Sequence, residues 1–207
     1  MKKVLYVYGG GPHPTEWIGG KISGLLDAGG KFKMEMTTDF DMFASLKESG
    51  YDAVIIYTAT FNDALKGKRE EGLLGFVREG GGLVGLHSAA FSFRESRSYI
   101  EMLNAEYFKH PDIHEFKISI ADKAHYITEG MADFSVYDEM YHLQNYDPSK
   151  ATLLFKTVWE GKDIPLVFAR DYGKGRLVYV ANGHTKEAWE NSEFQKIIVR
   201  AITYTAR

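Results

Sequence analysis

The chain has 207 residues, of which 44% are hydrophobic and 26% charged, and its formal net charge is -3. These values are typical of one ordinary globular domain, so we expect a single domain over residues 1–207 and no nucleic-acid partner, which would require a clustered basic surface. The apolar runs are too short for a membrane span or for a signal peptide, so we expect no membrane partner and a cytoplasmic location.

The sequence contains no cysteine. Disulfides, thiolate metal ligands and thiol nucleophiles are therefore unavailable. Any chemistry must come from histidine, carboxylate and hydroxyl groups.

The first half of the chain alternates between strand-like and helix-like segments. Strands are predicted from β-branched and apolar runs, and the segment 32–38 alternates apolar with polar residues as a strand near a sheet edge does. Alternation of strands with helices of this length indicates right-handed crossovers and a parallel sheet. The predicted strands are 3–8, 32–38, 52–60 and 83–86, and the predicted helices are 15–28, 39–49 and 66–79.

Residues 80–90 begin with three glycines, which are followed by a short apolar strand and then by His87 and Ser88. An apolar run of this kind suits a central strand that is covered on both faces. Ligands of open parallel α/β sheets bind outside the carboxyl ends of the strands, so His87 has a strong positional claim to a site. The alternative is a histidine satisfied by backbone groups.

After a predicted helix at 96–105, the second half of the chain no longer alternates strands with helices. Strands are predicted at 115–120, 151–158, 164–170 and 176–181, and the short turns between the last three require antiparallel pairing. The parallel sheet should therefore carry antiparallel additions. Residues 186–205 have the apolar spacing of a helix that packs on the sheet.

Five short motifs occur in order along the chain. They are Gly81 to Ala89, His110-Pro111, Asp138 to Tyr141, Tyr172 to Arg176 and Gly183 to Thr185. Together they resemble the ThuA-like, trehalose-utilisation family over nearly the whole chain, although this chain looks like a compact variant whose substrate-facing loops differ.

That family is similar in fold to the class I glutamine amidotransferases. The resemblance implies an α/β, flavodoxin-like fold with a three-layer parallel sheet flanked by helices. It places His87 near the position of the amidotransferase cysteine nucleophile, and because this chain has no cysteine, amidotransferase activity is excluded on chemical grounds.

The parallel sheet should bring several histidines together, because His13, His87 and His184 each follow the carboxyl end of a strand. Glu139 joins them by the resemblance alone, and a solvated pair of charges is the alternative for Asp138 and Glu139. The expected catalytic residues are His87, Glu139 and His184. The expected substrate-binding residues are His13, Ser88, His110 and Tyr141, with His13 and His110 at the rim.

Such a pocket suits either acid–base catalysis or a divalent metal such as zinc. Metal ligands would come from His13, His87, His110, Glu139 and His184. The metal-free form is preferred because the sequence has no tight ligand motif. A joint metal site of His110 and His114 is disfavoured because Pro111 stands between them.

The function predicted from these features is carbohydrate utilisation, by a hydrolase or isomerase type of enzyme that acts on trehalose, a related disaccharide or a keto-sugar. The alternatives are a non-catalytic sugar- or metabolite-binding protein and a degenerate amidotransferase-like subunit. The partner is a small sugar, and the sequence leaves open whether the chain forms a homo-oligomer. Candidates for an aromatic wall against the sugar are Trp17, Phe91, Phe93, Tyr107, Tyr141 and Trp189, although Trp189 suits the core better.

Overall fold

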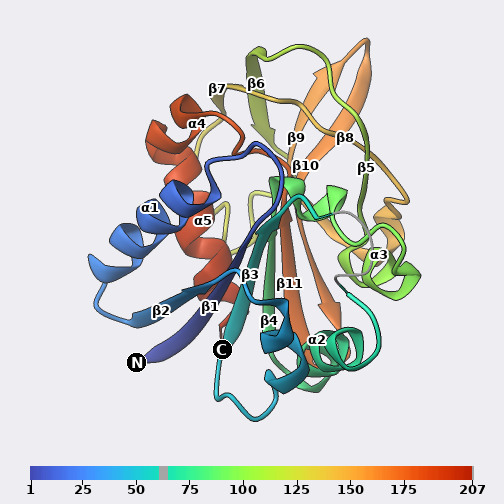
Figure 1. Cartoon of the computed structure of the whole chain (residues 1–207). Coiled ribbons are helices and arrows are strands. Elements are labelled where there is room, and N and C mark those ends of the chain that lie inside the picture. The colour runs from blue at the N-terminus through green and yellow to red at the C-terminus, as the bar shows by residue number, and fades with distance from the viewer. Residues whose placement is uncertain (61–64, 207) are drawn as a thin grey trace.

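A nine-stranded sheet forms the centre of the computed structural model, which describes residues 1–60 and 65–206 (Figure 1). Its order is β2-β1-β3-β4-β11-β10-β9-β6-β7; pairs from β2 to β11 are parallel, and the remaining pairs are antiparallel. The parallel strands are β1 (Lys2–Gly9), β2 (Phe32–Thr37), β3 (Ala53–Thr58), β4 (Gly82–Leu86) and β11 (Gly175–Val180). The antiparallel additions are β6 (His114–Ile120), β7 (Phe134–Asp138), β9 (Thr152–Trp159) and β10 (Lys162–Tyr172). A separate small sheet pairs β5 (Glu106–Lys109) with β8 (His142–Gln144).

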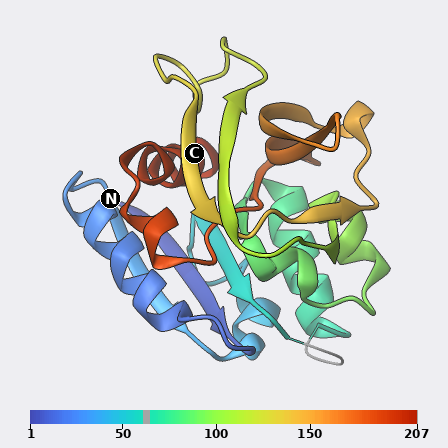
Figure 2. The same ribbon diagram turned by 90° about the horizontal axis from the view of Figure 1, so that it is seen from above.

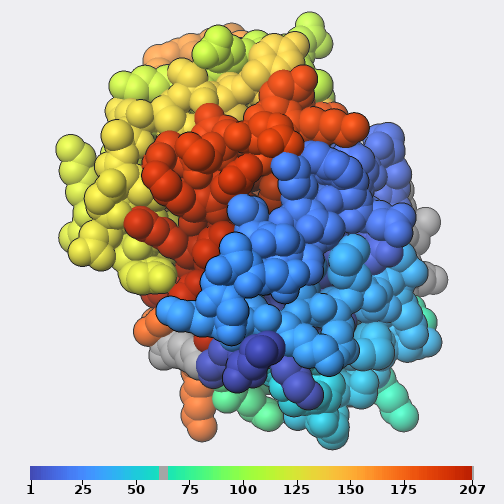
Figure 3. Space-filling view, turned by 90° about the vertical axis from the view of Figure 1, so that its left-hand side faces the viewer, coloured from blue at the N-terminus to red at the C-terminus, as the bar shows by residue number. Residues whose placement is uncertain are grey.

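Helices cover both faces of this sheet and complete the three layers that the sequence predicts (Figure 2). One face carries α1 (Thr15–Asp27), α4 (Lys186–Glu190) and α5 (Ser192–Thr205), and Figure 3 shows α1 lying beside the C-terminal helices. The other face carries α2 (Lys68–Glu79) and α3 (Arg97–Leu103). The predicted α/β fold with antiparallel additions in its second half is therefore confirmed.

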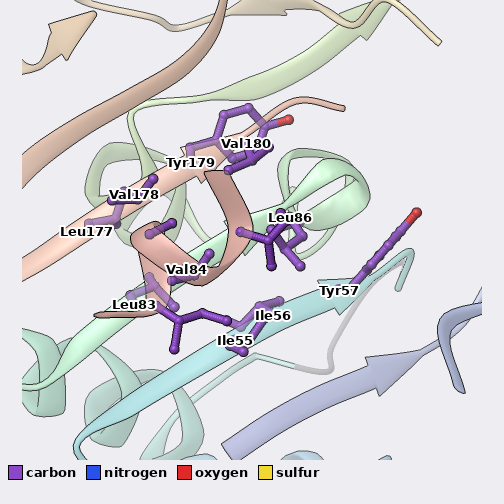
Figure 4. Packing of buried hydrophobic residues seen from close by; sticks show 14 of the residues in the cluster. Ile55, Ile56, Tyr57, Leu83, Val84, Leu86, Leu177, Val178, Tyr179 and Val180 are labelled. Atoms are coloured by element: carbon purple, nitrogen blue, oxygen red, sulfur yellow. The ribbon is translucent and has the colours of Figure 1, made fainter. Parts of the chain in front are cut away.

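The three strands β3, β4 and β11 lie side by side in the middle of the sheet and are almost wholly buried (Figure 4). Most of their side chains are Leu, Ile, Val or Tyr, and full burial of each large aliphatic side chain stabilises the fold by about 1.5–3 kcal/mol. Strand β2 lies at the edge, as its alternating pattern predicts. This core fixes the carboxyl ends of the parallel strands relative to one another.

Two predicted helices of the first half differ from the structure. The segment predicted as a helix at 39–49 is a 3-10 helix, η1 (Phe40–Ser45), whose preceding Asp39 side chain accepts a hydrogen bond from the Asp41 backbone N–H at 2.8 Å. Helix α2 begins at Lys68 rather than at residue 66. Gly72 in α2 is required by packing, since a Cβ there would lie 2.1 Å from the carbonyl oxygen of Phe43.

The predicted C-terminal helix at 186–205 is two helices, broken at Asn191. The Asn191 side chain accepts hydrogen bonds from the backbone N–H groups of Glu193 and Phe194 at 2.9 and 3.2 Å, and this cap starts α5. Strands β5, β7 and β8 were not predicted. They are short, and β5 and β8 pair across more than thirty residues of chain, which local patterns do not reveal. The strand predicted at 52–60 ends at Thr58.

Among the helices of residues 1–60 and 65–206, none has both the length and the apolar character needed to cross a bilayer.

Candidate active site

His87 lies where β4 ends, at the carboxyl edge of the sheet, and its side chain is fully buried. Its φ of 42° falls in the left-handed region, which is uncommon for a residue with a side chain and is a feature of functional turns. Its Nδ1 lies 2.8 Å from the carbonyl oxygen of Ala181, and its own carbonyl accepts a hydrogen bond from Tyr179 Oη at 2.9 Å. The residues around the strand ends therefore hold the imidazole in one orientation.

His13 enters the same region from the loop after β1. Gly10 and Gly11 have φ of 71° and 68°, and a Cβ on Gly11 would lie 2.7 Å from the Ala59 Cβ at the end of β3. The bare backbone of this loop can therefore pack against the end of β3 and turn His13 inward. The His13 ring centroid lies 5.1 Å from that of His87 and 5.0 Å from that of His184.

Asp138 is the last residue of β7, and Glu139 follows it; both lie beside the histidines at the carboxyl edge of the sheet. Asp138 is fully buried, and its carboxylate accepts hydrogen bonds from three successive backbone N–H groups after β11, those of Gly183 at 2.6 Å, His184 at 3.0 Å and Thr185 at 3.0 Å. The alternative of a solvated charge is therefore wrong for Asp138. These bonds fix the loop that carries His184 against the residue next to Glu139.

Glu139 is the centre of the histidine cluster. Its Oε2 lies 3.3 Å from His87 Nε2 and 3.3 Å from His184 Nδ1, and its Oε1 lies 3.6 Å from His110 Nε2. One potential ligand atom from each of His13, His87, Glu139 and His184 lies within 4.8 Å of every other. The structure therefore brings together the three expected catalytic residues and also places His13 among them rather than only at the rim.

Burial and mutual charge set the protonation of the cluster. Burial, reinforced by the neighbouring His87 and His184, lowers the pKa of His13 to about 3. Burial also lowers the pKa of His184. Burial alone would raise the pKa of Glu139, but the approach and charge of His87 and the charges of the other histidines outweigh it and leave this pKa lowered. The site at neutral pH thus combines a carboxylate with uncharged imidazole from at least His13.

A cavity of about 310 Å³ opens beside the cluster. His13, His110, Glu139 and His184 contribute its polar lining. Its apolar wall is a series of aromatic rings, Phe91, Tyr107 and Tyr141, whose successive centroids are 5.2 and 4.6 Å apart. The Tyr141 ring also lies over the imidazole of His87, with the centroids 4.0 Å apart. The cavity therefore places an aromatic surface next to the groups that could do chemistry.

Three larger hollows lie elsewhere on the described surface, of about 390 Å³ beside Arg97 and Asn145, about 510 Å³ beside Trp17 and about 350 Å³ beside Ser192 and Val199. The described lining of none of them contains a histidine. We assign the site to the smaller cavity because it gathers titratable groups with lowered pKa values against aromatic rings.

The remaining predicted site residues are not all equally close to the cavity. His110 lies in the loop after β5, and its ring stacks on Tyr141 with the centroids 5.9 Å apart. Ser88 is fully buried, and its hydroxyl has no hydrogen-bond partner among the described residues; it is not one of the described residues that line the cavity. A contact between Ser88 and substrate stays a prediction.

His114 does not lie beside His110 at the cavity. It begins β6, and its ring packs 5.2 Å from Trp159, while His110 faces Glu139. Of the aromatic candidates, Phe91, Tyr107 and Tyr141 line the cavity. Trp17 lies beside the separate hollow of about 510 Å³, and Phe93 and Trp189 belong to the core.

Sequence reasoning missed Tyr57 and the structural role of Asp138. Tyr57 Oη donates a hydrogen bond to the carbonyl of Gly183 at 2.7 Å, and Trp189 Nε1 donates to the same carbonyl at 2.8 Å. Both bonds fix the backbone next to His184. The position of Tyr57 near the end of a continuous apolar strand was the available signal, because such a residue lies near the carboxyl edge of the sheet.

These features define a flavodoxin-like α/β protein with a histidine and glutamate site at the carboxyl edge of its parallel strands. The family model described as ThuA, trehalose utilisation, matches residues 3–205, and the chain belongs to this family. The family that the five motifs resemble is thereby confirmed. No curated protein sequence gives a significant match.

Solved structures with the same fold include other ThuA-like proteins. A ThuA-like protein from Parabacteroides merdae ATCC 43184 superimposes with a TM-score of 0.85 at 20% identity, covering 99% of this chain and 90% of that one. A second from Bacteroides uniformis ATCC 8492 gives 0.82 at 18% identity, covering 97% and 89%. A β-galactosidase from Bacillus circulans sp. alkalophilus gives 0.65 at 14% identity, but this chain covers only 31% of it, so that likeness concerns the fold of one part.

Proposed function

We propose that the protein is an enzyme of carbohydrate utilisation, which acts on a disaccharide or keto-sugar in the cavity beside His87, Glu139 and His184. The observation that carries the proposal is the juxtaposition of an aromatic wall with a cluster of imidazoles around one carboxylate. An aromatic face suits the apolar face of a pyranose ring, and the polar groups opposite can bind and orient its hydroxyls. Family membership supports the class of substrate.

The chemistry we assign to the site is proton transfer to or from the bound sugar. Glu139 is held charged among histidines, and His184 lies against it while also lining the cavity, so this imidazole can exchange a proton with a substrate hydroxyl or carbon. His87 is buried behind Tyr141 and orients Glu139. The reaction class is therefore hydrolysis or isomerisation, as predicted from the sequence.

The other predictions on partners are part of this proposal. A small sugar is the ligand, no nucleic acid or membrane is a partner, and the protein acts in the cytoplasm. Without a thiol the protein should release no ammonia from glutamine.

The test begins with a thermal-shift screen of trehalose, other disaccharides and their keto derivatives, since a ligand that binds only the folded state raises the melting temperature. The best ligand is then used to measure affinity and turnover of wild type, His184→Ala and Glu139→Gln. We expect turnover to fall by about 100-fold or more in both variants, with sugar affinity much less affected, because acid–base groups contribute about 10²–10⁴-fold.

His114→Ala is the matched control, since this histidine packs on Trp159 away from the cavity, and its turnover should match wild type. A wild-type protein that binds a sugar tightly but converts none would support the non-catalytic sugar-binding alternative. If no sugar binds at all, the proposal fails.

A further inference from the structure

We propose that the cluster is a binding site for one divalent transition-metal ion of the zinc type, with the ligands His13, His87, Glu139 and His184. This deepens the proposed function and rests on it only for the identity of the substrate; with the ion bound, Glu139 and His184 act as ligands, and the proton transfer proposed above is their role in the metal-free protein. The site itself is argued from the arrangement of ligand atoms.

The first argument is the tautomer of His87. Its Nδ1 lies 2.8 Å from the carbonyl oxygen of Ala181, and a carbonyl can only accept, so Nδ1 carries the hydrogen. The other ring nitrogen, Nε2, then presents a lone pair, and it faces Glu139 Oε2 at 3.3 Å. Two lone-pair atoms in such an approach repel unless a cation or a shared proton lies between them. A backbone carbonyl on the far nitrogen is also the usual way in which proteins orient a metal-ligating histidine.

The second argument is the number of buried polar atoms that remain unsatisfied at this point. Among the described residues, none offers a hydrogen bond of acceptable geometry to His13 Nδ1, His87 Nε2 or His184 Nδ1, although all three atoms are inaccessible to solvent. The 3.3 Å approaches of the latter two to Glu139 meet the distance for an ion pair but not the direction of a hydrogen bond. Native proteins leave few such atoms unpaired, and three around one carboxylate indicate a common missing partner.

The third argument is distance. The four potential ligand atoms lie within 4.8 Å of one another. Tetrahedral zinc with ligands at about 2.0–2.2 Å separates them by about 3.4 Å, so small side-chain rotations would close the cluster around an ion. The contact with the Ala181 carbonyl holds His87, while no hydrogen bond among the described residues holds Nδ1 of His13 or of His184, so these two rings can rotate.

The ligand chemistry selects the class of ion. Three imidazoles and one carboxylate suit zinc and its transition-metal neighbours and do not suit magnesium or calcium, which prefer oxygen ligands. The cavity lies on the side of His13, Glu139 and His184, so a further coordination position would face the substrate. His110 approaches the other oxygen of Glu139 at 3.6 Å and is outside the four-atom group. We assign it to the substrate side of the site.

The experiment titrates Zn²⁺ into chelator-treated protein by calorimetry, without any sugar, and uses the absorption spectrum of Co²⁺ to report the coordination. Wild type should bind one equivalent. His184→Ala should weaken binding by about 100-fold or more, and Glu139→Gln by about tenfold or more, since loss of even an outer-shell partner typically costs 10–100-fold. His114→Ala should change the affinity by less than about twofold, because it lies outside the cluster.

Circular dichroism of each variant checks that it folds, and His184 and Glu139 are chosen because neither is as deeply enclosed as His87. The proposal is overturned if folded wild type shows no saturable binding at millimolar Zn²⁺, or if His184→Ala and Glu139→Gln bind Zn²⁺ as tightly as wild type does. In the first case a shared proton would join His87 to Glu139. Sugar turnover by the metal-free protein, measured separately, would leave the proposed function standing after such a failure.

Discussion

Asp138 and Glu139 are neighbours in the sequence, but their carboxylates occupy opposite kinds of environment. Both oxygens of Asp138 are used, because three backbone N–H groups of the loop after β11 donate to them. The oxygens of Glu139 face three imidazole nitrogens at 3.3–3.6 Å and border a cavity. One carboxylate is saturated by the backbone, and the other is left for a ligand.

The two neighbouring residues therefore have different roles: Asp138 holds the structure in place, and Glu139 is available for chemistry. A buried carboxylate that accepts from successive backbone N–H groups holds a loop in place, and here that loop carries His184. Because Asp138 positions the loop, Glu139 need not contribute to stability and can be surrounded by groups that leave it reactive. Active sites commonly depend on such a supporting group for their precision.

The largest effect we predict is on the stability of Asp138→Asn. The amide places a donor where the carboxylate accepts, so at least one buried backbone N–H group loses its partner and the remaining bonds lose their charge. The free energy of unfolding should fall by about 3 kcal/mol, measured by urea denaturation. Glu139→Gln, the matched change one residue away, should lower it by less than about 1 kcal/mol. Equal losses in the two variants would contradict the division of roles.

Much of the fold could be predicted from the sequence because its central strands are continuous apolar runs. Such runs require cover on both faces, and the helices between them supply it. The carboxyl edge, and with it His87, His13 and His184, follows from that topology. Strands β5 and β8 could not be predicted, since their pairing depends on contacts between segments remote in sequence.

The site was harder to predict where it depends on side-chain direction. Asp138 and Glu139 look alike in the sequence, and only the register of β7 against the loop after β11 decides which carboxylate points to the backbone. The absence of a local ligand motif favoured a metal-free site. In the structure the four potential ligands come from four separate segments, so no local motif could have revealed them.

The predicted effect of intermediate size concerns the aromatic wall of the cavity that Glu139 borders. Tyr107→Ala should weaken the affinity for the sugar found in the screen by about tenfold, because it removes one ring of the aromatic wall, and tenfold corresponds to about 1.4 kcal/mol. Calorimetric titration with that sugar measures the change. Phe108→Ala is the control, since its ring is 59% exposed and it is not one of the described residues that line the cavity. A sugar affinity that falls equally in both variants would rule out the wall.

The smallest effect we predict is on the stability of Asp133→Asn. This variant tests whether Asp138 stabilises the fold because it accepts backbone hydrogen bonds or because it is buried. Asp133 also accepts a hydrogen bond from a backbone N–H, that of Ile120 at 3.0 Å, and pairs with Lys117 Nζ at 2.9 Å, but its side chain is 37% exposed.

The hydrogen bond from the Ile120 N–H, and after it the one from Lys117, lowers the pKa of Asp133. Because a lowered pKa means that folding favours the charged form, this contribution is complete above the unfolded value of about 3.9 and disappears as the pH falls through the folded value. Solvent screens such a group, so Asp133→Asn should cost less than about 1 kcal/mol at pH 7, and this cost should vanish once the pH has fallen below the lowered pKa of the folded state. Urea denaturation of both proteins across this range measures the difference; a loss at pH 7 as large as that of Asp138→Asn would mean that burial is not what distinguishes the two aspartates.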